Sequence, residues 1–442
     1  MSRIMGTESI CPYCMKVIPA WYEVIDEQVF LCKECAEHGK MQTLFWRDGD
    51  MYLNWLDKAV HAPKNRDLNE PASGCPFDCG VCAEHEGGVC TAVLEITYRC
   101  NMGCKICFAD ATKETYEPDL ADIRTLYETA QQYGGDCSIQ LSGGEPTVRE
   151  DLPEIIRMGK EMGFSHIQVN TNGLRLAQDP EYAQLLKAAG ADLIFLQFDS
   201  TEDAVNEQIR GIKLFEAKCK AIEHCRRAEL GVLLVPTVIP GVNLEHLGTI
   251  VAFAKANMPI VKGIHFQPVS YFGRHPNEIP PDSLRCGLCD IIHGLEAQTG
   301  GEIHHRFLSQ RERFDPHCAF SGLFYLTEQG VLQGILPEMA DGVSEEAKDY
   351  AGAANRFTNA HWRYQQVESK EESTSSMQQF AERIASHTLS ITGMGFQDVW
   401  NVDIGRLRGC CVHVIASGGR AVPLCAFHLT GLHGERLYRN ES

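Results

Sequence analysis

The chain lacks an excess of positive charge and any long hydrophobic run. Its 442 residues include 59 acidic and 40 basic residues, which gives a formal net charge of −19. A strongly acidic protein repels a phosphate backbone, so nucleic acid is excluded as a general partner. Residues 1–10 have no apolar signal core, and no apolar run approaches the length of a membrane span. These absences predict a cytoplasmic protein with no transmembrane segment and room for two or three domains.

Cysteine, in contrast, is abundant, with twenty residues. Without a signal peptide, C-x2-C pairs favour metal sites in a reducing compartment over disulfides. The first two pairs flank residues 22–31, a short segment that predicts a hairpin. They predict a zinc-ribbon or rubredoxin-like site for one zinc or iron, with ligands Cys11, Cys14, Cys32 and Cys35. Met15 and Ala36 stand where rubredoxin-like knuckles usually carry glycine, which disfavours iron.

A second group of cysteines lies on a glycine- and proline-rich loop before the first expected barrel strand. Four thiolates within sixteen positions can wrap one [4Fe–4S] cluster, and a second zinc site is the alternative. The expected ligands are Cys75, Cys79, Cys82 and Cys90.

The most informative motif is C-x3-C-x2-C, formed by Cys100, Cys104 and Cys107 directly after the apolar run 92–96. Three thiolates on one loop can hold three irons of a [4Fe–4S] cluster, and no nearby cysteine supplies the fourth ligand. A structural zinc site normally takes four protein ligands, so zinc is disfavoured here. One open iron predicts chemistry at the cluster.

Strand-like and helix-like stretches alternate from residue 93 to about residue 272. Strands are expected at 93–97, 138–141, 166–170, 193–198, 231–238 and 263–269, with helices at 119–133, 152–162, 182–189, 214–229 and 244–256. This alternation predicts an α/β fold of parallel β/α units, whose active groups lie at the carboxyl ends of the strands. The candidate cofactor-binding residues at those ends are Gly143, Gly144, Glu145, Pro146, Asn172, Gln197, Asp199 and Thr237. Asp199 is suited to ribose hydroxyls or to a helix N-cap, and Asn172 with Gly173 favours a turn.

The remaining cysteines lie mostly after residue 276. A third metal site is expected from Cys318, Cys410, Cys411 and Cys425. Cys286 and Cys289 compete for it, but they fall in an amphipathic stretch typical of a helix. Residues 344–377 are polar and predict an exposed helix or linker.

The cysteine triad, with Phe108 after it and Gly-Gly-Glu-Pro at 143–146, resembles the radical S-adenosylmethionine (SAM) superfamily. The resemblance implies a partial (β/α)6 barrel in which SAM binds the open iron. It also implies that the Gly-Gly-Glu-Pro segment binds the amino group of SAM and that Cys100, Cys104 and Cys107 hold the catalytic cluster.

Nearly the whole chain resembles one branch, which includes tetraether lipid synthase-like proteins and pterin methylases. The resemblance suggests four parts: a zinc-ribbon or rubredoxin-like module at 1–45, an auxiliary cluster loop at 46–92, the barrel at 93–275 and a cysteine-containing extension at 276–442. The chain departs from the branch at Asp315-Pro316-His317, where an additional cysteine is expected.

The predicted function is therefore radical SAM chemistry that forms C–C bonds at an unactivated sp3 carbon, as in lipid-chain coupling. One alternative is methylation of a pterin or other small molecule from a folate-like donor. An alternative of another class is a multi-cluster electron-transfer or scaffold protein that does not cleave SAM. The expected cofactors are SAM, its [4Fe–4S] cluster, one or two auxiliary clusters and the N-terminal zinc or iron. The expected partners are a ferredoxin or flavodoxin reductant and, for a lipid substrate, transient contact with a membrane.

Overall fold

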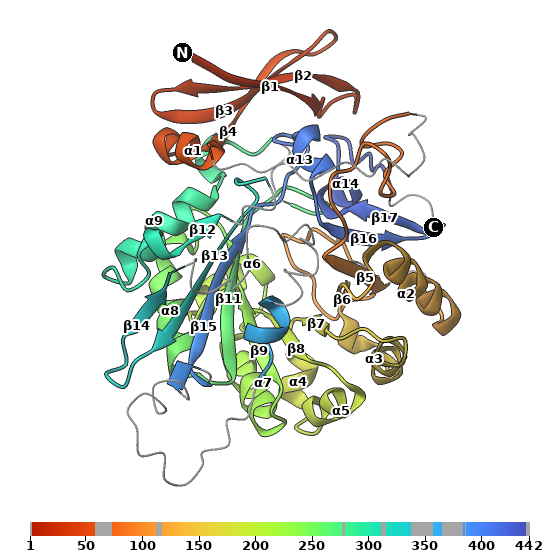
Figure 1. Ribbon diagram of the computed structural model, residues 1–442, viewed down its shortest axis with the longest axis vertical. Coiled ribbons are helices and arrows are strands. Elements are labelled where there is room, and N and C mark those ends of the chain that lie inside the picture. The colour runs from red at the N-terminus through yellow and green to blue at the C-terminus, as the bar shows by residue number, and fades with distance from the viewer. Residues whose placement is uncertain are drawn as a thin grey trace.

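The computed structural model describes residues 2–57, 73–111, 117–275, 279–310, 315–336, 357–364, 383–384 and 386–438. Apart from residues 357–364, the polar segment predicted at 344–377 lies outside these ranges. A small N-terminal sheet stands apart from a large mixed sheet flanked by helices (Figure 1).

The N-terminal sheet is an antiparallel meander in the order β1-β2-β3-β4. Its strands are β1 (Ser2–Ile10), β2 (Val17–Ile25), β3 (Gln28–Cys35) and β4 (Gly39–Trp46), followed by helix α1 (Gly49–Leu56). The predicted hairpin is present, because β2 and β3 are joined by the two-residue loop Asp26-Glu27. Both loop residues have positive φ, 48° and 64°, as a type I′ hairpin turn requires.

The predicted alternation of strands and helices forms the centre of the large sheet. The strands are β5 (Thr91–Thr97), β6 (Ser138–Gly143), β7 (Ile167–Thr171), β8 (Leu193–Gln197), β9 (Gly231–Val235), β10 (Thr237–Val238) and β11 (Val261–Pro268). The helices are α2 (Leu120–Gly134), α3 (Leu152–Glu161), α4 (Leu174–Gln178), α5 (Tyr182–Ala189), α6 (Asp203–Arg210), α7 (Phe215–Arg227) and α8 (Leu247–Ala256), with 3-10 turns η1 (Pro146–Val148) and η2 (Leu244–His246). Strands β5 to β9 and β11 pair in parallel, so the α/β fold class is confirmed.

The C-terminal region does not stand apart from this sheet. Its strands are β12 (Ser309–Gln310), β13 (Ala319–Leu326), β14 (Leu332–Ile335), β15 (Thr388–Met394), β16 (Val412–Ala416) and β17 (Arg420–Pro423), and its helices are α9 (Leu288–Gln298), α13 (Ile404–Arg408) and α14 (Leu424–His428). The 3-10 turns η3 (Asp282–Leu284) and η4 (His305–Phe307) flank α9. Strand β15 adds in parallel to β11, and β16 adds in parallel to β5 (Figure 1). Both edges of the predicted barrel are therefore covered by strands from beyond residue 275, which protects their backbone hydrogen-bonding groups.

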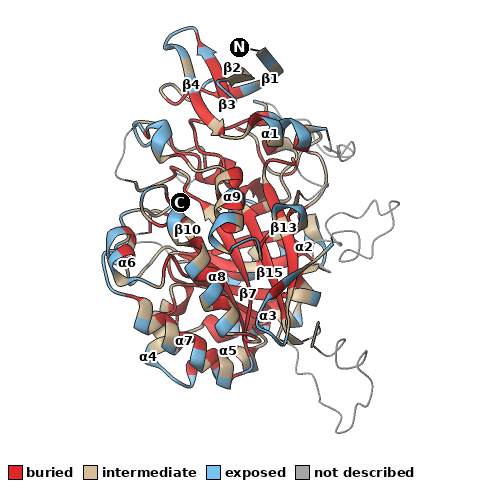
Figure 2. Cartoon of the chain, turned by 90° about the vertical axis from the view of Figure 1, so that its left-hand side faces the viewer, coloured by how far each residue is buried: buried red, intermediate tan, exposed pale blue. Residues whose placement is uncertain are grey.

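The core lies between the sheet and its helices, which expose their outer faces (Figure 2). Helix α3 shows how the pattern arises, because Ile155 and Ile156 are fully buried while Glu154 and Arg157 face solvent. Within the described ranges, no helix combines the length and apolar character that a membrane crossing requires.

Candidate active site and metal sites

A cavity of about 280 Å³ opens at the carboxyl ends of the parallel strands. It brings together sequence-predicted residues from five separate segments. Among its lining residues are Cys100, Cys104, Cys107, Gly143, Gly144, Glu145, Asn172, Gln197 and Thr237. The cavity also reaches Phe108, the aromatic residue after the cysteine motif. The location agrees with the rule that barrel chemistry occurs at the strand ends.

The loop that carries the three cysteines is tied to the far side of the barrel. Arg274, beyond the end of β11, exchanges backbone hydrogen bonds with Cys107 at 2.9 and 3.1 Å. Its Nε also donates to the carbonyl of Cys104 at 2.9 Å. These contacts fix the loop over the cavity, although Arg274 belongs to no motif recognised in the sequence.

The three thiols fit an iron–sulfur cluster by their chemistry and position. Burial raises the pKa of Cys100 to about 12 and also raises the pKa of Cys104, while the nearby Arg210 partly opposes the shift at Cys104. The thiols of Cys100 and Cys104 are therefore neutral until a metal replaces their protons, the usual coupling between metal binding and deprotonation. Three soft ligands around one side of an open cavity leave space for an exogenous ligand at a fourth iron.

The two glycines of the Gly-Gly-Glu-Pro segment allow close contact with the protein's own backbone. A Cβ on Gly144 would lie 2.1 Å from the carbonyl oxygen of Arg99, and one on Gly143 would lie 2.2 Å from that of Thr97. Gly143 also has a φ of 111°, which a residue with a side chain rarely adopts. The glycines thus press the Glu145 segment against the start of the cysteine loop.

Glu145 is buried and its carboxylate is held in one orientation. Oε1 accepts from the hydroxyls of Thr147 at 2.5 Å and Thr171 at 2.6 Å, and Oε2 accepts from the backbone N–H of Asn172 at 2.7 Å. These donors come from the ends of β6 and β7, and they set the carboxylate beside the cavity. A remaining lone pair can accept from a ligand ammonium.

Asp199 is placed differently from the sequence expectation. It is fully buried, it does not line the cavity, and its carboxylate binds Arg210 through Nε at 2.6 Å and Nη2 at 3.0 Å. Helix α6 has Glu202 rather than Asp199 at its N-cap. Arg210, which the sequence did not single out, lines the cavity in its place and donates to Thr237 Oγ1 and to the carbonyl of Ile106. Helix α6 ends at Arg210 and returns it to the strand end that carries Asp199.

A buried lysine supports the neighbouring strand ends. Lys218 Nζ donates to the carbonyl of Asn172 at 2.6 Å and to Gln197 Oε1 at 2.9 Å, and burial lowers its pKa to about 7. Asn172 Oδ1 accepts from Leu174 N at 3.0 Å and Gly173 has a φ of 77°, so the predicted turn is present. Sequence periodicity assigned Lys218 only to a helix.

The barrel interior below the cluster loop carries a group of amides among apolar side chains such as Phe195 and Val235. Asn170 Nδ2 lies 3.4 Å from Gln140 Oε1, and Gln168 Nε2 donates to Asn170 Oδ1 at 3.3 Å. Gln197 and Gln267 add further amides to the same cavity wall. Branched apolar side chains usually fill such barrels, so this group of amides indicates a polar ligand.

The N-terminal site differs from the predicted four-cysteine set. Cys35 and Cys32 are three residues apart on β3, so they face opposite sides of the sheet; Cys32 packs with Phe30 and Leu44. His38 takes its place: potential ligand atoms of Cys11, Cys14, Cys35 and His38 all lie within 4.8 Å of one another. Three cysteines and one histidine suit a structural zinc. A knuckle of this kind usually has a glycine after its second ligand. No glycine follows Cys35, but Gly39 follows His38 and has a φ of 73°. The second knuckle is therefore Cys-x2-His-Gly, and this glycine is the sequence signal for His38 as a ligand.

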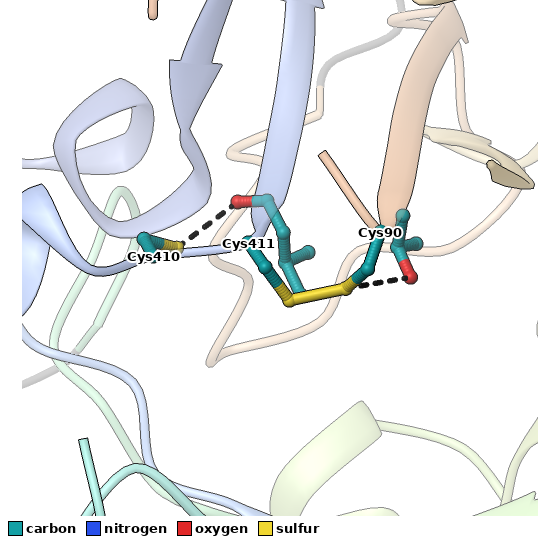
Figure 3. Close-up of a disulfide and its surroundings, with 5 residues drawn as sticks. Cys90, Cys410 and Cys411 are labelled. Atoms are coloured by element: carbon teal, nitrogen blue, oxygen red, sulfur yellow. Dashed lines mark hydrogen bonds between the residues drawn. A yellow bond between two sulfur atoms is a disulfide. The ribbon is translucent and has the colours of Figure 1, made fainter. Parts of the chain in front are cut away.

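The two expected auxiliary sets each retain three cysteines. Cys75 and Cys79 share a hydrogen bond and Cys82 lies nearby. In the other set, Cys410 is close enough to help raise the pKa of Cys318 and, together with Cys318, the pKa of Cys425. The fourth members, Cys90 and Cys411, are instead joined to each other as a disulfide (Figure 3). The proposed ligand sets are therefore three cysteines each, because a disulfide sulfur is not a thiolate ligand.

The chain's departure from the branch before Cys318 has a structural role. The ring of His317 stacks on Tyr52 with a centroid distance of 4.0 Å, and its Nε2 contacts the carbonyl of Tyr52. His317 thus packs against the N-terminal module. Cys318 itself accepts a hydrogen bond from Arg406 Nη2 at 2.9 Å. Cys289 is a buried residue of helix α9, as the amphipathic pattern predicted.

Comparisons with known proteins agree with this architecture. The sequence profile of the radical SAM superfamily matches residues 94–254, and that of the HMPTM N-terminal zinc ribbon domain matches residues 4–47. A 7,8-dihydro-6-hydroxymethylpterin dimethyltransferase of Methanocaldococcus jannaschii is 32% identical over 96% of this chain and 93% of its own length. A probable GTP 3′,8-cyclase of Sulfolobus acidocaldarius is 28% identical over 40% of this chain and 56% of its own. The structure of Streptococcus suis SuiB bound to S-adenosylmethionine has a TM-score of 0.41 at 14% identity, covering 49% of this chain and 48% of its own.

The fold, the three-cysteine loop and the two matching sequence profiles together define a radical SAM enzyme with an N-terminal zinc ribbon. The chain belongs to the radical SAM superfamily, in the branch that contains the pterin dimethyltransferase of M. jannaschii. The relative's name matches the alternative predicted from the sequence, pterin methylation, better than the coupling of lipid chains.

Proposed function

We propose that this protein is a radical SAM methylase of a pterin-type small molecule, acting at an unactivated carbon with a folate-like methyl donor. The observation that carries the proposal is a single cavity that joins the three-cysteine loop to a group of amides set in the otherwise largely apolar barrel interior. Amide side chains offer both donors and acceptors, which match the lactam and amino edges of a pterin ring. The similarity to the M. jannaschii enzyme over nearly the whole chain supports the same substrate class.

An acyl chain fits this cavity less well. Gln140, Asn170 and Gln197 bond to protein neighbours in part, and an acyl chain would replace water at their remaining donors and acceptors without forming a hydrogen bond. Each donor or acceptor left buried without a partner costs about 1–3 kcal/mol. Lipid-chain coupling is therefore the weaker hypothesis for this chain.

The roles of the residues follow from their positions. When bound at Cys100, Cys104 and Cys107, the cluster supplies the electron that cleaves SAM to a 5′-deoxyadenosyl radical. Glu145 is oriented by hydrogen bonds from Thr147, Thr171 and Asn172 to accept from the amino group of SAM. Arg210 faces the cavity beside Cys104 and offers a guanidinium to the carboxylate of SAM.

The proposed auxiliary clusters are held by two groups of three cysteines, Cys75 with Cys79 and Cys82, and Cys318 with Cys410 and Cys425. They would carry electrons between a ferredoxin or flavodoxin and the active site. The N-terminal zinc would stabilise the small β-sheet that packs on the C-terminal region. The reducing conditions that these groups require favour a cytoplasmic location.

The proposal is tested by anaerobic turnover of the reconstituted enzyme. It is incubated with SAM, dithionite, a folate-like methylene donor and 7,8-dihydro-6-hydroxymethylpterin, and products are identified by mass spectrometry. We expect 5′-deoxyadenosine and a pterin that has gained one or two methyl groups. The proposed substrate class is refuted if 5′-deoxyadenosine forms but the pterin remains unmethylated. The variant Gln140→Leu should bind the pterin more weakly and still bind SAM.

A further inference from the structure

The disulfide between Cys90 and Cys411 lies in the wall of the active-site cavity. Both residues line the space that Cys100, Cys104 and Cys107 also line. The adjacent Cys410 points elsewhere, with its Sγ 3.2 Å from the carbonyl of Val412 (Figure 3). Cys90 and Cys411 lie at the amino ends of the parallel strands β5 and β16, so Cys411 places its sulfur in that part of the cavity wall, while Cys410 turns its sulfur toward the proposed auxiliary site.

The backbone holds the two sulfurs next to each other. Cys90 precedes β5 and Cys411 precedes β16, and the two strands are already paired in parallel. Cys90 N also donates to the carbonyl of Cys411 at 2.9 Å. The Cα atoms are 5.3 Å apart, within the usual range for a disulfide. The pair is therefore preorganised for thiol–disulfide interconversion.

A purely structural role for this bond is disfavoured by its surroundings. The other eighteen cysteines are thiols, and the cluster-binding ones must be reduced to hold iron. In a reducing compartment, persistent disulfides are rare and those that form are usually transient and catalytic. The cavity is where radicals arise, and a thiol is a good hydrogen-atom donor to a carbon radical.

We propose that Cys90 and Cys411 form a redox-active dithiol that delivers a hydrogen atom to a radical in the active-site cavity. This inference rests on the proposed function, in which addition of the substrate radical to a methylene donor leaves a radical that must gain hydrogen. Cys411 is the more exposed of the two, so it is the donor and Cys90 is its resolving partner.

The proposed hydrogen-atom transfer conserves atoms and electrons. The S–H bond of Cys411 breaks homolytically, and its hydrogen forms a C–H bond with the carbon radical. Cys90 releases its proton to water and joins the Cys411 thiyl to form a disulfide radical anion. One electron then passes to an oxidised iron–sulfur cluster, which leaves the neutral disulfide. A dithiol reductant, of thioredoxin or dithiothreitol type, restores both thiols with two electrons and two protons.

The test compares the reconstituted full-length variants Cys90→Ser and Cys411→Ser with the parent protein. Cys219→Ser is the matched control, because Cys219 is a partly exposed thiol on α7 outside the cavity. All four proteins should contain equal iron and sulfide. Loss of iron from either cavity variant, but not from the control, would make the residue a cluster ligand and overturn the proposal.

Single-turnover reactions provide the second readout. Reduced protein is mixed with SAM, the methylene donor and 7,8-dihydro-6-hydroxymethylpterin, quenched by alkylation and mapped by mass spectrometry. We expect one Cys90–Cys411 disulfide per methylated product in the parent. Cys411→Ser should lose methylated product and still form 5′-deoxyadenosine. A disulfide content that is unchanged by turnover, or full methylation by Cys411→Ser, refutes the role.

Failure of the proposed function is recognised separately. If the parent forms no methylated pterin, that function is wrong. The dithiol proposal is then judged by titration with dithiothreitol alone, followed by alkylation. It predicts reversible opening and closing of this one bond with no loss of iron, whereas a bond that resists reduction in the folded protein is a structural crosslink and refutes it.

Discussion

The pairing of Arg210 with Asp199 yields a prediction whose size follows from the structure. Arg210→Met removes two charge-assisted hydrogen bonds to Asp199 and those to Thr237 and the carbonyl of Ile106. Asp199 is fully buried, so its carboxylate loses its only counter-ion among the hydrogen-bond partners described. Breaking a buried pair by removing one partner costs about 3–5 kcal/mol. We expect that loss in the free energy of unfolding.

Further variants complete a double-mutant cycle on this pair and separate the effect of charge from that of packing. Asp199→Asn should cost about 2–3 kcal/mol, because it leaves the Arg210 guanidinium partly unpaired. The double variant should cost less than the sum of the single variants by at least about 1 kcal/mol. Arg210→Lys keeps the charge but not the planar fork, so it should rescue stability only partly.

The assay is anaerobic urea unfolding followed by tryptophan fluorescence, with SAM binding measured by calorimetry. Arg227→Met is the matched control, since its pair with Glu223 is exposed; exposed pairs contribute about 0–1 kcal/mol. Arg210→Met should also weaken SAM binding, while Arg227→Met should not. Equal changes in stability for the two variants would refute the reasoning.

Three other changes test separate parts of the account. His38→Ala should release the N-terminal zinc and Cys32→Ala should retain it, as zinc analysis of purified protein will show; the opposite result restores the four-cysteine set. Burial lowers the pKa of His166 to about 4, below its unfolded value of about 6.5, so the unfolded chain binds more protons between these values and stability falls as the pH drops. The loss due to His166 is about 2 kcal/mol at pH 5. In a urea series at pH 5 and 7, the drop in stability should be smaller by that amount in His166→Asn than in the parent, and His85 and His413, whose pKa values burial also lowers, contribute equally to both proteins. Gly144→Ala forces a Cβ against the carbonyl of Arg99 and should reduce cluster content, whereas Gly103→Ala meets no atom within 4 Å and should leave the iron content unchanged.

The sequence predicted the central barrel closely because period and spacing carry that information. Strands β5 to β9 fall within a few residues of their expected bounds, and the loop from Cys100 to Cys107 lies at a strand end as parallel β/α units require. Strands β15 and β16 were not predicted. They follow a polar segment and a cysteine pair, and their partners β11 and β5 lie more than a hundred residues away in the sequence.

The side-chain partners were harder to predict than the elements. Spacing alone cannot distinguish Cys32 from His38 as a ligand, because the choice depends on which face of β3 Cys32 occupies and on the turn after β3 that carries His38. Asp199 was recognised as functional from its strand end, but its partner Arg210 is selected by the path of α6. Cys90 and Cys411 were assigned to different clusters because pairing across 321 positions leaves no local signal.

The central claim is that Cys100, Cys104 and Cys107 hold a cluster whose open iron binds and cleaves SAM. The most direct measurement is the EPR spectrum of the reduced, reconstituted protein before and after SAM is added, with 5′-deoxyadenosine quantified in the same samples. The account predicts a SAM-dependent change in the spectrum and formation of 5′-deoxyadenosine by the parent, with neither in Cys104→Ala. A spectrum unaltered by SAM, or equal cleavage by Cys104→Ala, would contradict it.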